Sequence, residues 1–184
     1  MNIQNFSKTL YSSKETALTQ DLYMNEFQDW FKYNYNFVQL CITISINKYY
    51  PNIFLENSYS RNGKEIKFDI LFTDKYQQQI MLIFLANEYY QKYNKNPEEL
   101  DLAHLLEQHW NSGASILYDL FFKHKNIDND IKFTNNNLSS LLTDIFSLLP
   151  QVTKSDDSTT IYYNSNDNDI SAEFIERLKL SLSQ

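Results

Sequence analysis

The stretch KEIKFDILFTDKYQQQIMLIFLAN, residues 64–87, decides the fold because it permits two different structures. It can form two β-strands around a turn, or one strand followed by a long helix. Thr73 or Asp74 is a suitable helix N-cap, and straight-chain helix formers such as Gln, Met and Leu dominate the residues after it. We therefore predict a helix over about 74–93. We expect it to be central and buried on most sides, because residues 80–86 are apolar all around it.

The residues before this helix favour a small antiparallel sheet. FVQLCITISI, residues 37–46, alternates between β-branched or apolar residues and smaller or polar ones, which is typical of a strand. An Asn-Gly pair at 62–63 separates the strand-like segments 53–60 and 65–72, and such a pair is a strong hairpin signal. These patterns predict a three-stranded antiparallel meander over about 37–72.

The predicted fold class is α+β, mainly helical, with the meander packed on a helical bundle. A chain of 184 residues fits one domain, which we take to span 1–184. The remaining predicted segments are a loosely ordered stretch at 1–18, helices at about 19–36, 97–110, 113–124 and 137–149, a solvated loop at 151–160, a short strand at 160–164 and an amphipathic helix at 170–183. Gly113 is expected to lie in the loop between two of these helices.

Composition excludes several classes of function. The chain contains only two glycines, Gly63 and Gly113, so it cannot build a phosphate-binding loop, a dinucleotide fingerprint or a nucleophile elbow. We expect no cofactor. The net charge of −7 opposes direct binding to nucleic acid and suits a basic protein partner. The abundance of Asn, Lys, Tyr and Ile is typical of AT-rich genomes, which favours a bacterium, a phage or a mobile element as the source.

The sequence also indicates where the protein works. Its single cysteine, Cys41, excludes an intrachain disulfide and is compatible with a reducing compartment. We expect no membrane association, because no apolar run reaches the roughly 18 residues of a membrane span. The first residues lack the apolar region of a signal peptide, so a cytoplasmic protein is expected. The oligomeric state stays open.

The three histidines are candidate ligands or catalysts. His104 and His109 are five residues apart and do not share a helix face, so we expect no zinc site and place them with Glu107 on a solvated face. His124 is expected at a helix C-terminus, where positive charge is favoured. Cys41 is expected to be an inert, buried thiol. A triad that assembles only in three dimensions stays possible.

The segment 53–87 weakly resembles the core of PD-(D/E)XK nucleases. The match rests on Asp69 in IKFDILF, with Glu56 upstream in place of the family's helical acid. The resemblance implies a Mg²⁺ site in which two acids hold the metal and a lysine orients water. However, the positions expected to hold Glu-x-Lys fall at residues 83–86, which read Ile-Phe-Leu-Ala. The resemblance therefore implies an inactive relative, and a helix over 78–86 would remove the nuclease geometry altogether.

The C-terminal third is acidic and contains two adjacent tyrosines. Carboxylates around aromatic rings suit a basic protein partner, because the rings anchor the contact and the charge steers it. The candidate partner-binding residues are Asp156, Asp157, Tyr162, Tyr163, Asp167 and Asp169.

Together these observations lead to one functional hypothesis and two alternatives. We expect a non-enzymatic, acidic protein-binding protein of the inhibitor, immunity or anti-defence type, which occludes a basic partner. The first alternative is an inactive nuclease-like protein built around Asp69 and Glu56. The second is an adaptor or structural subunit whose exposed tyrosines face another helix.

Overall fold

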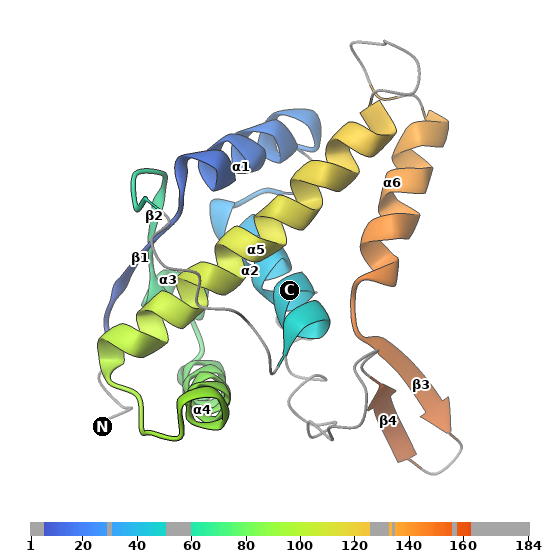
Figure 1. Ribbon diagram of the computed structural model, residues 1–184. Coiled ribbons are helices and arrows are strands. Elements are labelled where there is room, and N and C mark those ends of the chain that lie inside the picture. Colours follow the sequence, from blue (N-terminus) through green and yellow to red (C-terminus); the bar gives the residue numbers. More distant parts are fainter. Residues whose placement is uncertain are drawn as a thin grey trace.

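The computed structural model describes residues 6–28, 31–50, 60–125, 133, 135–155 and 158–162. These residues form a mainly helical fold with two small antiparallel strand pairs, which confirms the helical class and the presence of a minor sheet (Figure 1). The helices are α1 (Lys14–Glu26), α2 (Asn34–Tyr49), α3 (Phe68–Leu71), α4 (Lys75–Tyr93), α5 (Glu99–Lys125) and α6 (Asn135–Ser147). The strands are β1 (Thr9–Tyr11), β2 (Glu65–Lys67), β3 (Gln151–Ser155) and β4 (Ser158–Tyr162).

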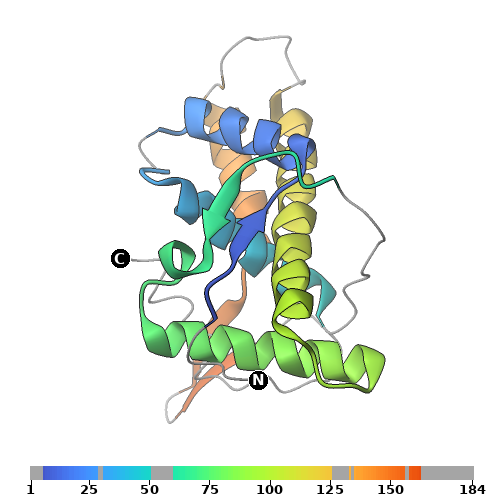
Figure 2. The same cartoon turned by 90° about the vertical axis from the view of Figure 1, so that its left-hand side faces the viewer.

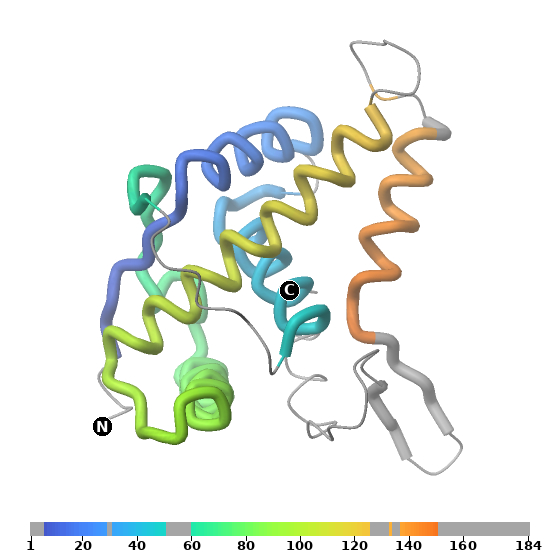
Figure 3. Tube along the Cα trace, viewed as in Figure 1, coloured from blue at the N-terminus to red at the C-terminus, as the bar shows by residue number. Residues whose placement is uncertain are grey.

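The long helix α5 is the centre of the fold, and helices α1, α2, α4 and α6 pack against it. Figure 3 traces α5 as one unbroken helix, so the prediction of two helices with a loop at Gly113 is wrong. Gly113 serves another purpose, because a Cβ atom there would lie 1.9 Å from the carbonyl oxygen of Cys41 on α2. The glycine allows α2 and α5 to cross with their backbones almost in contact.

Helix α2 replaces the first predicted strand. The predicted strand 37–46 is wrong because this segment is buried on nearly every side, so its alternation reflects no exposed face. Its polar side chains are satisfied inside the helix or across it: the Thr43 hydroxyl donates to the Gln39 carbonyl at 2.9 Å, and the Gln39 amide donates to the Leu71 carbonyl at 2.7 Å. Tertiary burial thus overrides the β propensity of the isoleucines and threonines.

Strand β2 pairs with a different strand from the one predicted. β2 pairs antiparallel with β1, with Leu10 opposite Ile66, and residues 68–71 turn into α3. The three-stranded meander over 37–72 is therefore wrong; residues 53–59 lie outside the described residues. Gly63 lies so close to Ser13 that a Cβ atom would approach the Ser13 carbonyl oxygen to 2.1 Å.

The N-terminal segment is more ordered than the sequence suggests. Leu10 is completely buried, and α1 begins at Lys14 with the Ser13 hydroxyl accepting a hydrogen bond from the Thr16 backbone N–H at 3.1 Å. Within the stretch 1–18 that was predicted to be loose, the described residues thus contain a strand and the start of a helix.

Helix α4 confirms the prediction for residues 74–93. The carboxylate of Asp74 accepts hydrogen bonds from the backbone N–H groups of Tyr76 and Gln77, both at 2.9 Å, and Asn94 ends the helix in the left-handed conformation. However, α4 is not central: Figure 2 shows it along the lower side of the molecule. Tyr76, Ile83 and Tyr90 of this helix are exposed.

The C-terminal part of the described chain contains α6 and the β3–β4 hairpin. Helix α6 occupies most of the predicted helix 137–149, but the predicted loop 151–160 is wrong, because β3 and β4 pair there in antiparallel register. The predicted helix 170–183 lies outside the described residues. No helix in the described part of the chain is long and apolar enough to cross a lipid bilayer.

Candidate protein-binding groove

Three residues with the chemistry of a hydrolase triad meet in the core. The Nδ1 atom of His109 lies 3.0 Å from the Ser45 hydroxyl, and its Nε2 atom lies 2.9 Å from Glu88 Oε2. With the ring proton on Nε2, the imidazole donates to Glu88 and accepts from Ser45. All three residues are 0% exposed, so no substrate reaches the serine, and the triad works as a buried polar link between α2, α4 and α5.

Glu107 is a second buried polar group on α5. Its Oε1 atom accepts hydrogen bonds from the Tyr11 backbone N–H and from the Arg61 guanidinium, both at 2.8 Å. The guanidinium also stacks on the Tyr11 ring, 4.4 Å from its centroid. The prediction of a solvated face for Glu107 and His109 is therefore wrong, because both side chains anchor other elements to α5. Only His104 is half-exposed.

The nuclease resemblance does not lead to a site. Asp69 is exposed on the short helix α3, residues 78–86 are helical, and Glu56 lies outside the described residues. Residues 66–86 thus do not form the paired strands that carry a PD-(D/E)XK centre. Among the residues that the structure describes, no three His, Cys, Asp or Glu side chains are placed to hold a metal ion. Burial raises the pKa of the Cys41 thiol, as expected for an inert cysteine.

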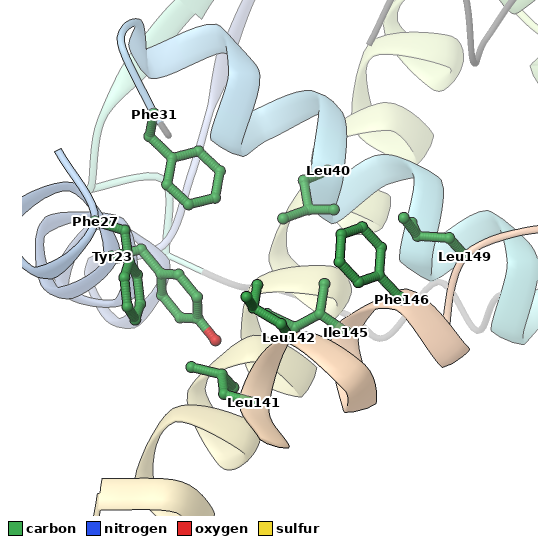
Figure 4. Close-up of a pocket in the computed structure, with 9 residues that line it drawn as sticks. All are labelled: Tyr23, Phe27, Phe31, Leu40, Leu141, Leu142, Ile145, Phe146 and Leu149. Carbon is green, nitrogen blue, oxygen red and sulfur yellow. The ribbon is translucent and has the colours of Figure 1, made fainter. Parts of the chain in front are cut away.

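An apolar groove lies between α6 and the pair of helices α1 and α2. It encloses a cavity of about 280 Å³, and the side chains around it come from four segments of the chain (Figure 4). None of them is charged. The groove is lined by Tyr23, Phe27, Phe31, Leu40, Leu141, Leu142, Ile145, Phe146 and Leu149.

The geometry of α6 explains why the groove stays open. Leu141 and Ile145 are buried against the core, whereas Phe146 on the next position is 61% exposed. On the α5 side, Asp144 accepts from Lys123 Nζ at 2.7 Å and contacts His124 Nε2 at 2.9 Å. Helix α6 is therefore held along α5, while its apolar face toward α1 and α2 remains partly unfilled.

The side of the groove opposite α6 is formed by Tyr23, Phe27 and Phe31, and it presents aromatic rings rather than polar atoms to the cavity. The Tyr23 hydroxyl donates to the Leu117 carbonyl at 2.9 Å, so the tyrosine offers only its ring to the cavity. Burial raises the pKa of Tyr23, which keeps the hydroxyl neutral. Phe27 and Phe31 pack against that ring, with centroid separations of 5.5 and 6.1 Å. This wall is thus built of aromatic side chains that pack against one another.

In the sequence, the predicted binding residues follow the last residue that lines the groove. Leu149 lines the groove, Pro150 follows, and β3 begins at Gln151, which pairs with Tyr162 of β4. The other candidates, Asp156, Asp157, Tyr163, Asp167 and Asp169, lie outside the described residues. Sequence reasoning missed the groove itself. The only signal for it was the segment 138–149, which has more apolar residues than a single core-facing helix face requires.

The structure of this chain is the basis for any functional inference. No family model, no curated protein and no solved structure matches the chain. Function must therefore be inferred from the groove, the buried polar links and the charge of the chain itself.

Proposed function

We propose that the chain is a non-enzymatic protein-binding protein, which holds an apolar helical segment of a basic partner in the groove between α6 and α1–α2. The observation that carries this proposal is the all-apolar, uncharged lining of an open cavity with Phe146 exposed at its edge. An amphipathic helix laid into such a groove buries its apolar face, which is a recurring mode of protein recognition.

The size of the groove fits side chains rather than a cofactor. Ligand pockets commonly range from about 300 to 1,000 Å³, so a cavity of about 280 Å³ is at the small end. With no charged side chain in its lining, the cavity offers nothing to orient a phosphate or a carboxylate. It can accept a few apolar side chains from one face of a helix.

Charge favours a basic partner. The chain carries a net charge of −7, and Asp156 and Asp157 follow the groove-lining residue Leu149 in the sequence. A negative net charge steers a basic amphipathic helix toward the chain, and such steering accelerates association more than it tightens binding. A protein that covers a basic surface in this way would block that surface from nucleic acid, which is the action of an inhibitor or an immunity protein.

A peptide-binding experiment tests the proposal directly. The probe is a fluorescent amphipathic peptide in which Leu and Lys alternate at helical spacing, compared with a twin in which every Lys is Glu and with a scrambled peptide. The full chain is expected to bind the Leu-Lys peptide with an affinity that falls with salt, and to bind the other two much more weakly.

A pair of variants locates the binding site. Phe146→Ser is expected to weaken peptide binding about tenfold, the size of a modest hot spot. Leu100→Ser, a similarly exposed apolar residue at the N-terminal end of α5, is the control and should leave binding unchanged. Equal binding by Phe146→Ser and the wild type, or equal binding of the acidic twin, would contradict the proposal.

A further inference from the structure

The chain leaves the β3–β4 hairpin beside the groove. Strand β3 begins at Gln151, two positions after the groove-lining Leu149, and the antiparallel register places Tyr162 of β4 opposite Gln151. Figure 1 shows β4 running back toward the end of α6 from which β3 departs. Because paired strands lie about 5 Å apart, the residues after Tyr162 are attached next to the end of the groove that Leu149 lines.

The sequence after this attachment point suits the groove. Residues 163–184 lie outside the described residues, and their sequence predicts a mainly polar spacer at 163–169 followed by an amphipathic helix at 170–183. Asp169 is a suitable N-cap directly before that helix. The apolar side of the predicted helix carries Ile170, Phe174, Ile175, Leu178 and Leu182.

We infer that residues 170–183 dock in the groove as a helix when no partner is bound, and that a partner must displace them. This inference rests on the proposed function, since it concerns the regulation of the same site. The spacer is long enough for such docking. From Tyr162 to Ile170 an extended chain spans about 26 Å, whereas the 13 residues of α6 extend only about 20 Å.

Attachment to the hairpin favours this segment over an unattached occupant. A short flexible linker gives a tethered group an effective concentration of about 1 mM. A segment that binds the groove with a dissociation constant of only about 0.1 mM would then fill it in about 90% of the molecules. Weak apolar contact with an uncharged lining is therefore sufficient for the chain's own segment, whereas a free partner at a lower concentration must bind more tightly.

The charge of the segment distinguishes it from the proposed partner. Residues 170–183 are electrically neutral, because two acids and two bases balance: Glu173, Glu176, Arg177 and Lys179. Docking of a neutral segment changes little with salt, whereas the attraction of a basic partner to a chain of net charge −7 weakens as salt rises. Low salt therefore favours the partner, and high salt favours the chain's own segment.

Thiol labelling of the full chain tests the docking without any partner. Leu142→Cys places a thiol in the lining of the groove, and the native Cys41 is completely buried. In this background Phe174→Ser should raise the labelling rate about fivefold, because a tenfold weaker segment leaves the groove open in about half of the molecules rather than in about a tenth. Leu180→Ser is the matched control, since residue 180 lies on the opposite side of the predicted helix, and it should leave the rate unchanged.

Two results of the labelling experiment would overturn the inference. The first is an equal labelling rate in the Phe174→Ser and Leu180→Ser variants. The second is protection that strengthens with protein concentration, which would mean that the segment of another copy fills the groove.

Peptide binding separates this inference from the proposed function. With Leu142 retained, Phe174→Ser should bind the Leu-Lys peptide about fivefold more tightly than the wild type, and Leu180→Ser should bind it equally. Faster labelling with Phe174→Ser, together with no peptide binding by any variant, would support the docked segment and contradict the proposed function. Equal peptide binding by Phe174→Ser and the wild type would show that the segment does not compete, and it would overturn the inference.

Discussion

The two sides of α5 differ in how they hold their neighbours. Toward β1, α2 and α4, α5 presents buried polar side chains that are bonded to specific atoms of those elements. Toward α6, the contact is apolar inside, with a partly exposed ion pair at Asp144 and a cavity beside it. Polar links fix one arrangement because a shifted helix would leave buried groups unpaired, whereas an apolar contact tolerates adjustment. The first side is therefore held in one arrangement, whereas the second leaves room for adjustment.

The rigid side is fastened at several points along α5. Asn111 accepts hydrogen bonds from the Ser13 backbone N–H at 2.9 Å and from the Thr16 hydroxyl at 2.6 Å. Its amide donates to the Glu107 carbonyl one turn earlier at 2.8 Å. One side chain therefore joins the start of α1 to the middle of α5.

The largest effect is expected at the closest backbone approach on the rigid side. Gly113→Ala should destabilise the protein by about 3 kcal/mol or more, because the new methyl group collides with the backbone of Cys41, which cannot rotate away. Urea denaturation followed by circular dichroism measures the loss. Ser115→Ala, an exposed position on the same helix, serves as the control and should be neutral or slightly stabilising.

A smaller loss is expected at the buried carboxylate. Glu107→Ala removes the acceptor for the Tyr11 N–H and the Arg61 guanidinium, and it should cost about 2 kcal/mol of unfolding free energy. Because Arg61 is partly exposed, the loss should stay below that of a fully buried ion pair. Glu107→Gln keeps an oxygen acceptor and should recover part of the loss in the same denaturation experiment. If both variants are as stable as the wild type, β1 is not fastened through this residue.

The hydrogen bond of Ser45 should contribute less to the free energy of unfolding than Glu107 does. Ser45→Ala removes the hydroxyl beside His109 Nδ1 and should destabilise the protein by about 1 kcal/mol, the usual value for a neutral hydrogen bond. Thermal unfolding gives the measurement, with Ser139→Ala on the exposed face of α6 as the control. A loss no greater than that of the control would mean that the buried triad does not help to hold α2 on α5.

The smallest effect is expected on the adaptable side. Lys123 and His124 hold the pKa of Asp144 below its ordinary value of 3.8, so this carboxylate stabilises the folded state while it is ionised. Asp144→Asn should cost about 0.5 kcal/mol at pH values above 4, as for an exposed ion pair. The difference from the wild type should shrink as the pH falls below 3.8, where the carboxylate takes up a proton. Thermal unfolding of both proteins across this pH range shows whether the stability difference shrinks or grows as the pH falls. A difference that grows on acidification would contradict it.

The sequence was informative where local signals were sufficient. The cap at Asp74 and the straight-chain residues after it predicted α4 correctly, because both act within a few residues. Local signals failed at α2, where burial on all sides removes the helical periodicity, and at β2, whose partner lies more than fifty residues earlier in the chain. Gly113 suggested a loop because sequence alone does not reveal that another backbone passes beside it.

The groove could not have been predicted in the same way. Its lining includes residues that the sequence placed on the predicted helices, such as Tyr23, Phe27 and Phe31. A cavity, however, depends on the distance between helices, which the pattern of apolar residues does not encode. The acidic residues proposed from sequence were chosen for charge, whereas the groove is defined by its lack of charge.

The tie between Ser13 and Asn111 has a consequence for the order of events during synthesis. The bonded atoms belong to residues 98 positions apart, and the Tyr11 N–H is bonded to Glu107, 96 positions away. A ribosome releases the N-terminal strand long before it releases the helix that receives it, so β1 must wait until α5 has emerged. Contacts of such long range slow folding. Strand β1 is thus translated well before α5 but reaches its final place only after α5 is available to receive it.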